Sequence, residues 1–257
     1  MPRLLRDTLL VARREAAALV ASPLLYVLCG VFFLLGAFVF LSLLVNFSQE
    51  AFQDRSGGYV NVTQSVVRQT FHAVHFFLIA QIPLLTMRGF AEDRANGMLD
   101  LLRTTPLGEW PLVLGKFLGA FAAMAFFVAL TLAFPLAAEA VSNPEWSVVA
   151  SGWLALLLAS AAYIAIGMFC SALTESQVVA AVLSYVALLG LSLLSALGAL
   201  TRGTAWEDAA KHFGASEHIE AFLRGELAPM HIAYFALLAW TFLFLAARVL
   251  ESQRWRS

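Results

Sequence analysis

The sequence is poor in charged residues and in cysteine. Charged residues make up 13% of its 257 residues and hydrophobic residues 61%, against about 25% and about 45–50% in soluble globular domains. With a mean hydropathy of +0.80, this composition excludes an ordinary soluble domain and predicts a membrane protein. Cys29 and Cys170 lie in separate apolar stretches, so we expect free thiols rather than a disulfide framework or structural zinc.

The sequence also lacks the short motifs of common catalysts. It contains no G-x-x-x-x-G-K-[ST] phosphate loop, no H-E-x-x-H and no G-x-S-x-G. The chain is therefore expected not to hydrolyse ATP unaided. No string of carboxylates lies within the apolar runs, which disfavours a transporter driven by protons or sodium ions. The 16 basic residues nearly cancel the 17 acidic ones, so the net charge does not point to nucleic acid.

Six apolar stretches are long enough to cross a bilayer, because about 20 helical residues at about 1.5 Å each span the hydrocarbon layer. We expect an all-α membrane protein with one transmembrane domain over 1–257. Its spans are predicted at 23–47, 69–87, 112–138, 147–170, 177–200 and 228–247. Eleven of the 16 Lys and Arg residues flank these spans on the side of the two termini, which predicts that both termini are cytoplasmic.

Residues 1–22 have the pattern of an amphipathic helix that lies in the inner membrane interface. Apolar residues recur near helical spacing from Leu5 to Val20, while four arginines gather on the other side. We expect Pro23 to end this helix where the chain turns into the bilayer. The helix would orient the protein as an anchor or, alternatively, recognise lipid.

The longest inner loop between spans, 88–111, carries seven charges and must leave the bilayer. Asn96-Gly97 is expected to be a break or cap, and Thr104-Thr105-Pro106 a stop. The short helix between them would have an apolar side and a polar side, formed by Met98, Leu99, Leu101 and Leu102 and by Asp100 and Arg103. It would fit a groove on another protein, or it would fold back on its own bundle.

The other loops have recognisable helix ends. In the second inner loop, Thr174 and Gln177 fit a capping box, with Glu175 in the first turn of the next helix. Capping alone explains these residues, and contact with a partner is the alternative. The sequence pattern of the outer loop, 202–228, predicts short helices at 206–213 and 217–224. The second would have Ser216 as N-cap, a Glu220–Arg224 pair and Gly225 as its stop.

Several side chains of the outer half were considered as functional groups. Phe213, Ile219, Phe222 and Leu223 would face the bilayer or the bundle mouth as a lid, with His218 a surface residue rather than a ligand. His72 and His75 lie in the outer half of the second span with Gln69 and Gln81, where polar side chains usually face the bundle interior. The sequence fixes no carboxylate or thiol beside the two histidines, so we predict no metal site.

Three segments together resemble the permeases of type-2 ABC exporters. The run FAEDRANGMLDLLRTTPLGEWPLVLGK, 90–116, resembles their first cytoplasmic loop, and SALTESQVVAA, 171–181, resembles their second. The run SEHIEAFLRGELAPMHIAYF, 216–235, is similar to the outer loop of the gliding-machinery (GldF) type. The first motif is carried by Glu92, Gly97, Leu99, Leu102, Pro106, Gly115 and Lys116.

The resemblance implies a multi-pass subunit of the bacterial cytoplasmic (inner) membrane that is not itself an enzyme. It implies no cofactor in this chain, because ATP and Mg would be bound by a separate cytoplasmic ABC ATPase. A second permease subunit would complete a homodimer or heterodimer in the lipid bilayer. Members of the GldF type are also associated with a membrane protein that bears a large extracytoplasmic domain.

The resemblance also implies roles for individual residues. The helix over 96–103 would be the coupling helix that docks on the ATPase, and the loop around Glu175 would make a second contact. The coupling residues would be Glu92, Gly97, Met98, Leu99, Asp100, Leu102, Arg103, Pro106, Thr174, Glu175 and Gln177. Re-entrant helices would close the extracytoplasmic side, with His218, Phe222, Arg224 and Gly225.

Three functions remain open at this point. The leading hypothesis is an ABC export permease, in which ATP binding to the partner ATPase moves the coupling helix and changes the packing of the spans. The alternative is an ATP-driven mechanical or signalling complex that acts on an extracytoplasmic partner without moving solute. The third and least supported is a membrane enzyme that uses His72 and His75. The residues do not identify a transported molecule.

Overall fold

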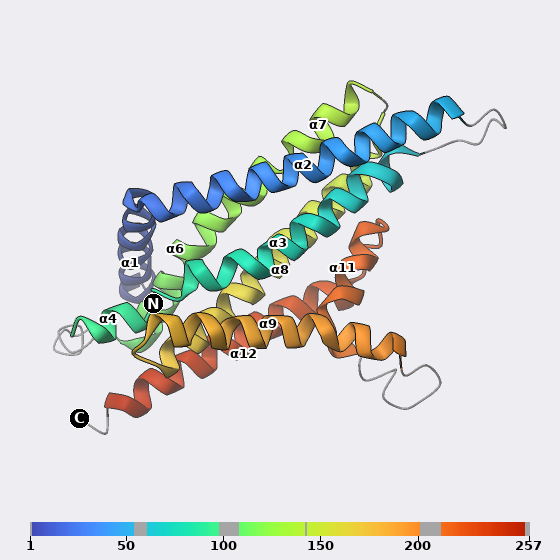
Figure 1. Cartoon of the computed structure of the whole chain (residues 1–257). Helices are drawn as coiled ribbons and strands as arrows, with labels where there is room; N and C mark the ends of the chain where they lie inside the picture. Colours follow the sequence, from blue (N-terminus) through green and yellow to red (C-terminus); the bar gives the residue numbers. More distant parts are fainter. Residues whose placement is uncertain (1, 54–60, 98–107, 142, 201–211, 255–257) are drawn as a thin grey trace.

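The computed structural model describes residues 2–53, 61–97, 108–141, 143–200 and 212–254, and their secondary structure is entirely helical (Figure 1). The prediction of an all-α protein is therefore confirmed. The elements are α1 (Pro2–Ala21), α2 (Pro23–Gln53), the π-helical turn η1 (Thr63–Val67), α3 (Arg68–Thr86), α4 (Ala91–Ala95), α6 (Glu109–Leu130), α7 (Ala133–Glu139), α8 (Trp146–Leu173), α9 (Gln177–Leu200), α11 (Ala215–Leu223) and α12 (Pro229–Arg254).

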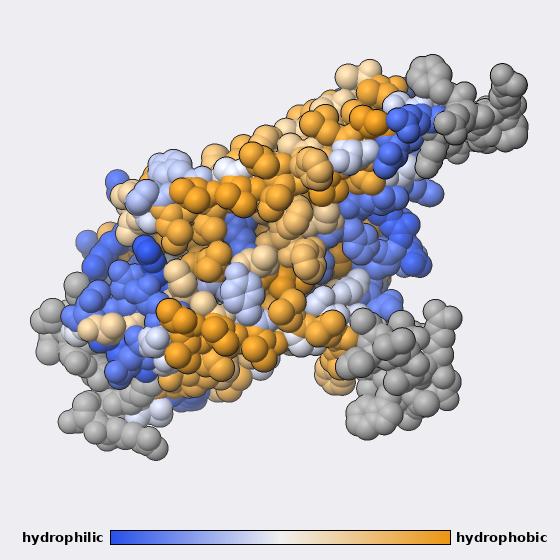
Figure 2. All heavy atoms as spheres, viewed as in Figure 1, coloured by the Kyte–Doolittle hydropathy of each residue, from blue (hydrophilic) through white to orange (hydrophobic). Residues whose placement is uncertain are grey.

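Six helical stretches in the described residues are long and apolar enough to cross a membrane, which confirms the predicted number of spans. They are Pro23–Gln49, Thr63–Ala95, Glu109–Glu139, Trp146–Leu173, Gln177–Ser195 and Pro229–Ser252. Both chain ends lie at the same end of the bundle (Figure 1), as an even number of passes requires. We call this the terminus end, and the other the opposite end. In Figure 2, hydrophobic residues cover the middle of the visible face.

Helix α8 lies at the centre of the bundle. Its apolar window is 72% buried and that of the second span 61%, whereas those of α2 and α12 are 17% and 22% buried. The outer helices therefore leave most of their apolar surface to lipid. Small residues explain the central place of α8, because Ala155, Ala159 and Ala162 are fully buried and let neighbouring helices approach closely.

The third span is interrupted where the sequence predicted one continuous helix. Helix α6 ends at Leu130 and α7 begins at Ala133. Pro135 has no N–H to donate to the carbonyl of Thr131, and the N–H of Phe134 bonds that carbonyl instead at 3.1 Å. The span therefore continues past a tight turn into a short second helix.

Helix α1 is amphipathic and crosses the start of α2 steeply (Figure 1). Its large apolar side chains point away from the bundle, with Leu5 and Leu9 each 64% exposed, so that face is free to enter the membrane interface. The predicted end of this helix at Pro23 is confirmed to within two residues. Helix α1 already ends at Ala21, and Pro23 is the first residue of α2, a position where its missing N–H costs no hydrogen bond.

The inner face of α1 packs on α6 at two glycines, Gly115 and Gly119. A Cβ on Gly119 would lie 2.7 Å from the Cβ of Glu15 and 3.2 Å from the carbonyl oxygen of Ala12. A Cβ on Gly115 would lie 2.5 Å from the Cβ of Val11. The G-x-x-x-G spacing thus lets two helix backbones touch, a signal that our sequence interpretation did not use.

We predict that Gly119→Ala destabilises the protein by about 1–3 kcal/mol, because the added methyl overpacks a contact formed partly by backbone atoms. Gly190→Ala in α9 is the matched control, since a Cβ there meets nothing within 4 Å. Thermal melting of the purified protein in detergent measures the difference. Equal melting temperatures for the two variants would contradict the close packing of α1 on α6.

Candidate functional site

The loop between the second and third spans is held against the end of α8 by one hydroxyl. The Oγ of Ser171 accepts the backbone N–H groups of Phe90 and Ala91, each at 3.0 Å, and donates to the carbonyl of Met87 at 3.3 Å. The first N–H groups of a helix have no partner within it, so Ser171 stabilises the start of α4. Phe90 and Ala91 are fully buried, which fixes this part of the loop in the bundle.

A second bond joins the same two elements. Arg94 on α4 donates from Nη2 to the carbonyl of Ala172 at 2.8 Å. Ala172 lies in the last turn of α8, where carbonyl groups lack partners within the helix. Helix α4 is therefore attached to α8 at both of its ends, and these attachments join the first inner loop to the start of the second.

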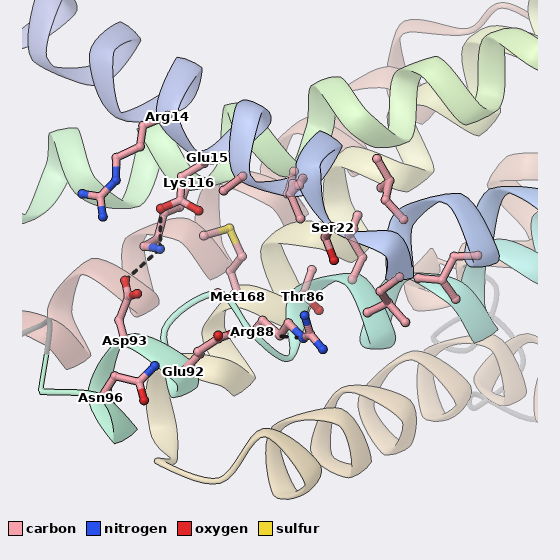
Figure 3. A pocket seen from close by; sticks show the side chains of 18 residues that line it. Arg14, Glu15, Ser22, Thr86, Arg88, Glu92, Asp93, Asn96, Lys116 and Met168 are labelled. Atoms are coloured by element: carbon pink, nitrogen blue, oxygen red, sulfur yellow. Dashed lines mark hydrogen bonds and ion pairs between the residues drawn. The ribbon is translucent and has the colours of Figure 1, made fainter.

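A buried ion-pair cluster, Glu15–Lys116–Asp93, joins three elements at the terminus end (Figure 3). The ammonium of Lys116 on α6 lies 2.7 Å from Glu15 of α1 and 2.8 Å from Asp93 of α4. The Lys116 side chain is 5% exposed, and its charge also lies 5.7 Å from the ring centre of Phe90. A buried ammonium requires such partners because an isolated charge at low dielectric is very costly.

The sequence interpretation did not predict the ion-pair cluster. Lys116 was used there as a flanking charge and as a motif residue, and neither Glu15 nor Asp93 was connected with it. A signal was present, since Lys116 directly precedes a long apolar run, and a cation so placed needs a partner or a route to water. The identity of its partners depends on the α1–α6 packing, which local pattern does not determine.

The predicted coupling residues are divided between described and undescribed parts of the chain. Glu92 faces Arg88, with 4.0 Å between Oε2 and Nε. Gly97 has φ +68° directly after the C-cap Asn96, so the predicted break at Asn96-Gly97 is confirmed. The other members of the first-loop set lie outside the described residues, namely Met98, Leu99, Asp100, Leu102, Arg103 and Pro106.

In the loop between α8 and α9, the start of α9 lies where the sequence predicted it, but a different residue caps it. Helix α9 begins at Gln177, and the preceding residue, Ser176, accepts the N–H of Val179 at 3.5 Å. The Thr174 hydroxyl instead accepts the N–H of Ser176 at 3.2 Å. Ser176 is therefore the N-cap, and the predicted capping box of Thr174 and Gln177 is wrong. Glu175 precedes the helix rather than lying in its first turn.

At the opposite end, α11 covers the bundle as a short amphipathic helix. Ile219, Phe222 and Leu223 are buried, and the carbonyl of Phe222 accepts a bond from Ser151 of α8 at 2.7 Å. Phe213 is 65% exposed and does not share this burial. The first predicted outer helix, 206–213, lies mainly outside the described residues.

The ends of α11 agree only in part with the prediction. Gly225 has φ +86°, and the N–H of Glu226 bonds the carbonyl of Ala221 at 3.0 Å, which is the Schellman arrangement. The predicted stop at Gly225 is therefore confirmed, as is the Glu220–Arg224 pair at 3.4 Å. The N-cap is Gly214, so Ser216 lies inside the helix and its predicted capping role is wrong.

The prediction that His218 is a surface residue was wrong. Its ring is buried against Tyr234, with 4.0 Å between ring centres, and its Nδ1 lies 2.7 Å from Nδ1 of His231 on α12. Its Nε2 lies 3.2 Å from the carbonyl oxygen of His212. Burial lowers the pKa of His218 below its ordinary value; the bond to the carbonyl of His212 opposes this shift, and the neighbouring His231 adds to it.

The side chains of His72 and His75 contact different residues. His72 and Arg68 both contact the carboxylate of Glu220, so the opposite end has a carboxylate that ties α11 to α3. His75 is buried and bonds the hydroxyl of Tyr163 at 2.8 Å. Among the described residues, no group of three or more His, Cys, Asp or Glu side chains is arranged to hold a metal.

Replacing Lys116 by methionine is predicted to destabilise the fold by about 3 kcal/mol, because two partly buried carboxylates lose their counter-charge. The triple variant Lys116→Met, Glu15→Gln, Asp93→Asn removes those charges as well and is expected to recover most of the loss. Chemical denaturation in detergent measures both. A single variant at least as stable as the triple one would show that the ion-pair cluster does not act as a unit.

The contact between α11 and α12 is predicted to weaken in acid. The folded pKa of His218 is depressed, so the fold favours its neutral ring. That stabilisation is complete above the unfolded value of about 6.5 and is lost as pH falls towards the folded pKa. The hydrogen-exchange protection factors of 215–223, which correct for the slower intrinsic exchange in acid, should fall between pH 7.5 and pH 5, and less so in His218→Phe. Equal pH dependence in both proteins would refute this.

Comparison with known proteins agrees with this architecture. The family model described as ABC-2 family transporter protein matches residues 52–204. These residues cover the second to fifth spans and the loop between the second and third spans, including the bonds that attach α4 to α8. No curated protein matches the sequence. More than half of the chain thus fits the family model, and the chain belongs to the ABC-2 transporter family as a multi-pass transmembrane component.

Proposed function

We propose that the protein is the membrane subunit of an ABC exporter, closest to the gliding-machinery (GldF) type. A separate cytoplasmic ATPase would hydrolyse ATP, and this bundle would change its packing to move an unidentified substrate out across the bacterial inner membrane. Family membership supports the role of a transmembrane component. The missing phosphate loop makes a partner ATPase necessary, with ATP and Mg bound there rather than here.

The observation that carries the proposal is the attachment of α4 to three other helices. Helix α4 ends at Ala95, and we propose the following segment, 96–103, as the coupling helix; its residues 98–103 lie outside the described part of the chain. Helix α4 contacts α8 through Ser171 and Arg94 and joins α1 and α6 through Lys116. A force applied to the segment would therefore act on α4 and, through it, on the core of the bundle.

Helix α8 extends this connection to the opposite end. It runs without interruption over 28 residues, about 42 Å at 1.5 Å per residue. It contacts α4 at Ser171 and α11 at Ser151. We therefore propose that α11 is the closing element of the extracytoplasmic side, held by Glu220 to α3, and that movement of α8 opens or closes it.

The remaining proposals depend on which end of the bundle faces the cytoplasm. We place the terminus end, with both chain ends, in the cytoplasm and the α11 end outside. The loop around Glu175 lies next to the Arg94–Ala172 attachment in the sequence, so we propose it as the second ATPase contact. A second permease subunit, identical or different, would face this one, and a companion with a large extracytoplasmic domain fits the proposed GldF type.

We predict that Leu99→Asp combined with Leu102→Asp abolishes co-purification of the partner ATPase, because charge on the apolar side of the segment would prevent docking. The control is Ser252→Asp, which adds one aspartate at the terminus end on an exposed residue of α12. Pull-down with a candidate cytoplasmic ABC ATPase that co-purifies with the original protein measures the result. Undiminished co-purification of the double variant would overturn the coupling assignment.

Vesicle transport separates export from an ATP-driven mechanical or signalling complex. Reconstituted complex is expected to accumulate a substrate in an ATP-dependent manner, and that substrate is expected to stimulate ATP hydrolysis. Stimulation by an extracytoplasmic protein alone, with no accumulation in vesicles, would refute export and support the alternative.

A further inference from the structure

A cavity of about 290 Å³ opens at the terminus end, beside the ion-pair cluster (Figure 3). Its walls come from α1, the start of α2, the end of α3, α4, α6 and α8. Neither the family match nor the proposed coupling path assigns a role to this cavity. Its two sides differ in chemistry, and this difference indicates what it holds.

One side of the cavity is apolar. Five leucines line it, contributed by the last turn of α1, the first turns of α2 and the end of α3, namely Leu19, Leu24, Leu25, Leu28 and Leu85. A small water-soluble ligand would gain nothing from such a wall, whereas hydrocarbon chains would bury against it. The apolar wall therefore favours an amphiphile.

The other side carries an equal number of positive and negative side chains. Its cations are Arg14, Arg88 and Lys116, and its anions are Glu15, Glu92 and Asp93. Lys116 already holds Glu15 and Asp93. Arg14, Arg88 and Glu92 remain. Of these, Arg88 and Glu92 have 4.0 Å between their nearest charged atoms and are 45% and 40% exposed. A long, exposed pair of this kind is weak, so both groups can turn to a ligand.

The cavity lies at the depth of lipid headgroups. Helix α1, which forms one wall, exposes its leucines away from the bundle, as a helix in the membrane interface does. The apolar span of α2 begins at Pro23, directly after Ser22 in the cavity wall. The polar half of the cavity thus faces the headgroup layer of the terminus-end leaflet, and the leucines face its acyl region.

We propose that this cavity binds a zwitterionic phospholipid with a primary amine, of the phosphatidylethanolamine type. The phosphate binds the guanidinium of Arg88, which forms strong charge-assisted bonds with phosphate oxygens, and the hydroxyl of Ser22. The ammonium donates to Glu92, while an acyl chain lies along the leucines of α2. The balanced charges favour a zwitterion over an anionic lipid, and a choline group has no N–H to donate to Glu92.

The site shares Glu92, Asp93 and Lys116 with the proposed coupling path, but its ligand is a lipid rather than the ATPase. Its lipid would fix α1, α2 and α4 relative to one another by filling the space between them. Lipid binding is measured on this protein alone, without ATPase or substrate. Failure of the lipid proposal would therefore leave the coupling proposal standing, and the converse also holds.

The test is thermal melting of the purified, delipidated protein in detergent with added lipid. Phosphatidylethanolamine at a hundredfold excess over its Kd is expected to raise Tm by roughly 5–10 °C. Phosphatidylcholine and phosphatidylglycerol are expected to bind at least about tenfold more weakly, since each loses a charge-assisted contact. Water-soluble glycerophosphoethanolamine should have no effect at the same concentration.

Two variants locate the binding. Arg88→Gln is expected to weaken phosphatidylethanolamine about tenfold, through loss of the phosphate partner. Ala18→Trp is expected to abolish the shift, because Ala18 is exposed at the cavity wall and an indole there fills the mouth without entering the core. Arg248→Gln, at an exposed pair with Glu251 on α12, is the matched control and should respond like the original protein.

Glu92→Gln tests the headgroup preference. It is expected to remove the advantage of phosphatidylethanolamine over phosphatidylcholine while leaving the phosphate contact intact. Four results would each overturn the proposal: equal shifts with the three lipids, an undiminished response in Ala18→Trp, an equal loss in Arg248→Gln and Arg88→Gln, or a full shift with glycerophosphoethanolamine. The last would indicate a soluble phosphate ester as the ligand.

Discussion

The ammonium of Lys116 is buried where three helices meet, and much of the terminus end depends on satisfying it. Its two carboxylate partners come from α1 and α4, so the charge is compensated only when both helices are in place. Leaving a charge without partners at low dielectric costs several kcal/mol. Lys116 therefore requires α1, α4 and α6 to pack together.

The same requirement explains neighbouring features. Gly115 and Gly119 flank the lysine within one turn on either side and allow α1 to approach α6 closely enough for Glu15 to reach it. Ser171 and Arg94 then attach α4 to α8, the most buried span. These contacts hold α1, α4, α6 and α8 together at the terminus end. The cavity lies beside these four helices, and α2 and α3 complete its wall.

Local sequence patterns were sufficient to predict the helices but not the contacts between them. Hydropathy predicted six spans because each must match the bilayer alone. Asn96-Gly97 was predicted as a break or cap and Gly225 as a helix stop, and both glycines have the positive φ that favours glycine. The bond of Lys116 to Glu15 joins residues 101 positions apart, and His218 is buried by residues of α12. Such contacts depend on how helices pack, so the sequence interpretation missed the cluster and misplaced His218.

The central claim is that α4 and α8 move as one body when the partner ATPase binds ATP. Spin labels at Ala95 and Leu173, both exposed, in a protein with Cys29 and Cys170 replaced by alanine, report this by pulsed electron resonance in the assembled complex. We expect the distance between the two labels within one subunit to stay constant on ATP addition, while the distance from the Ala95 label to a label on the second permease subunit changes. A changed distance within the subunit, with an unchanged distance between subunits, would contradict it.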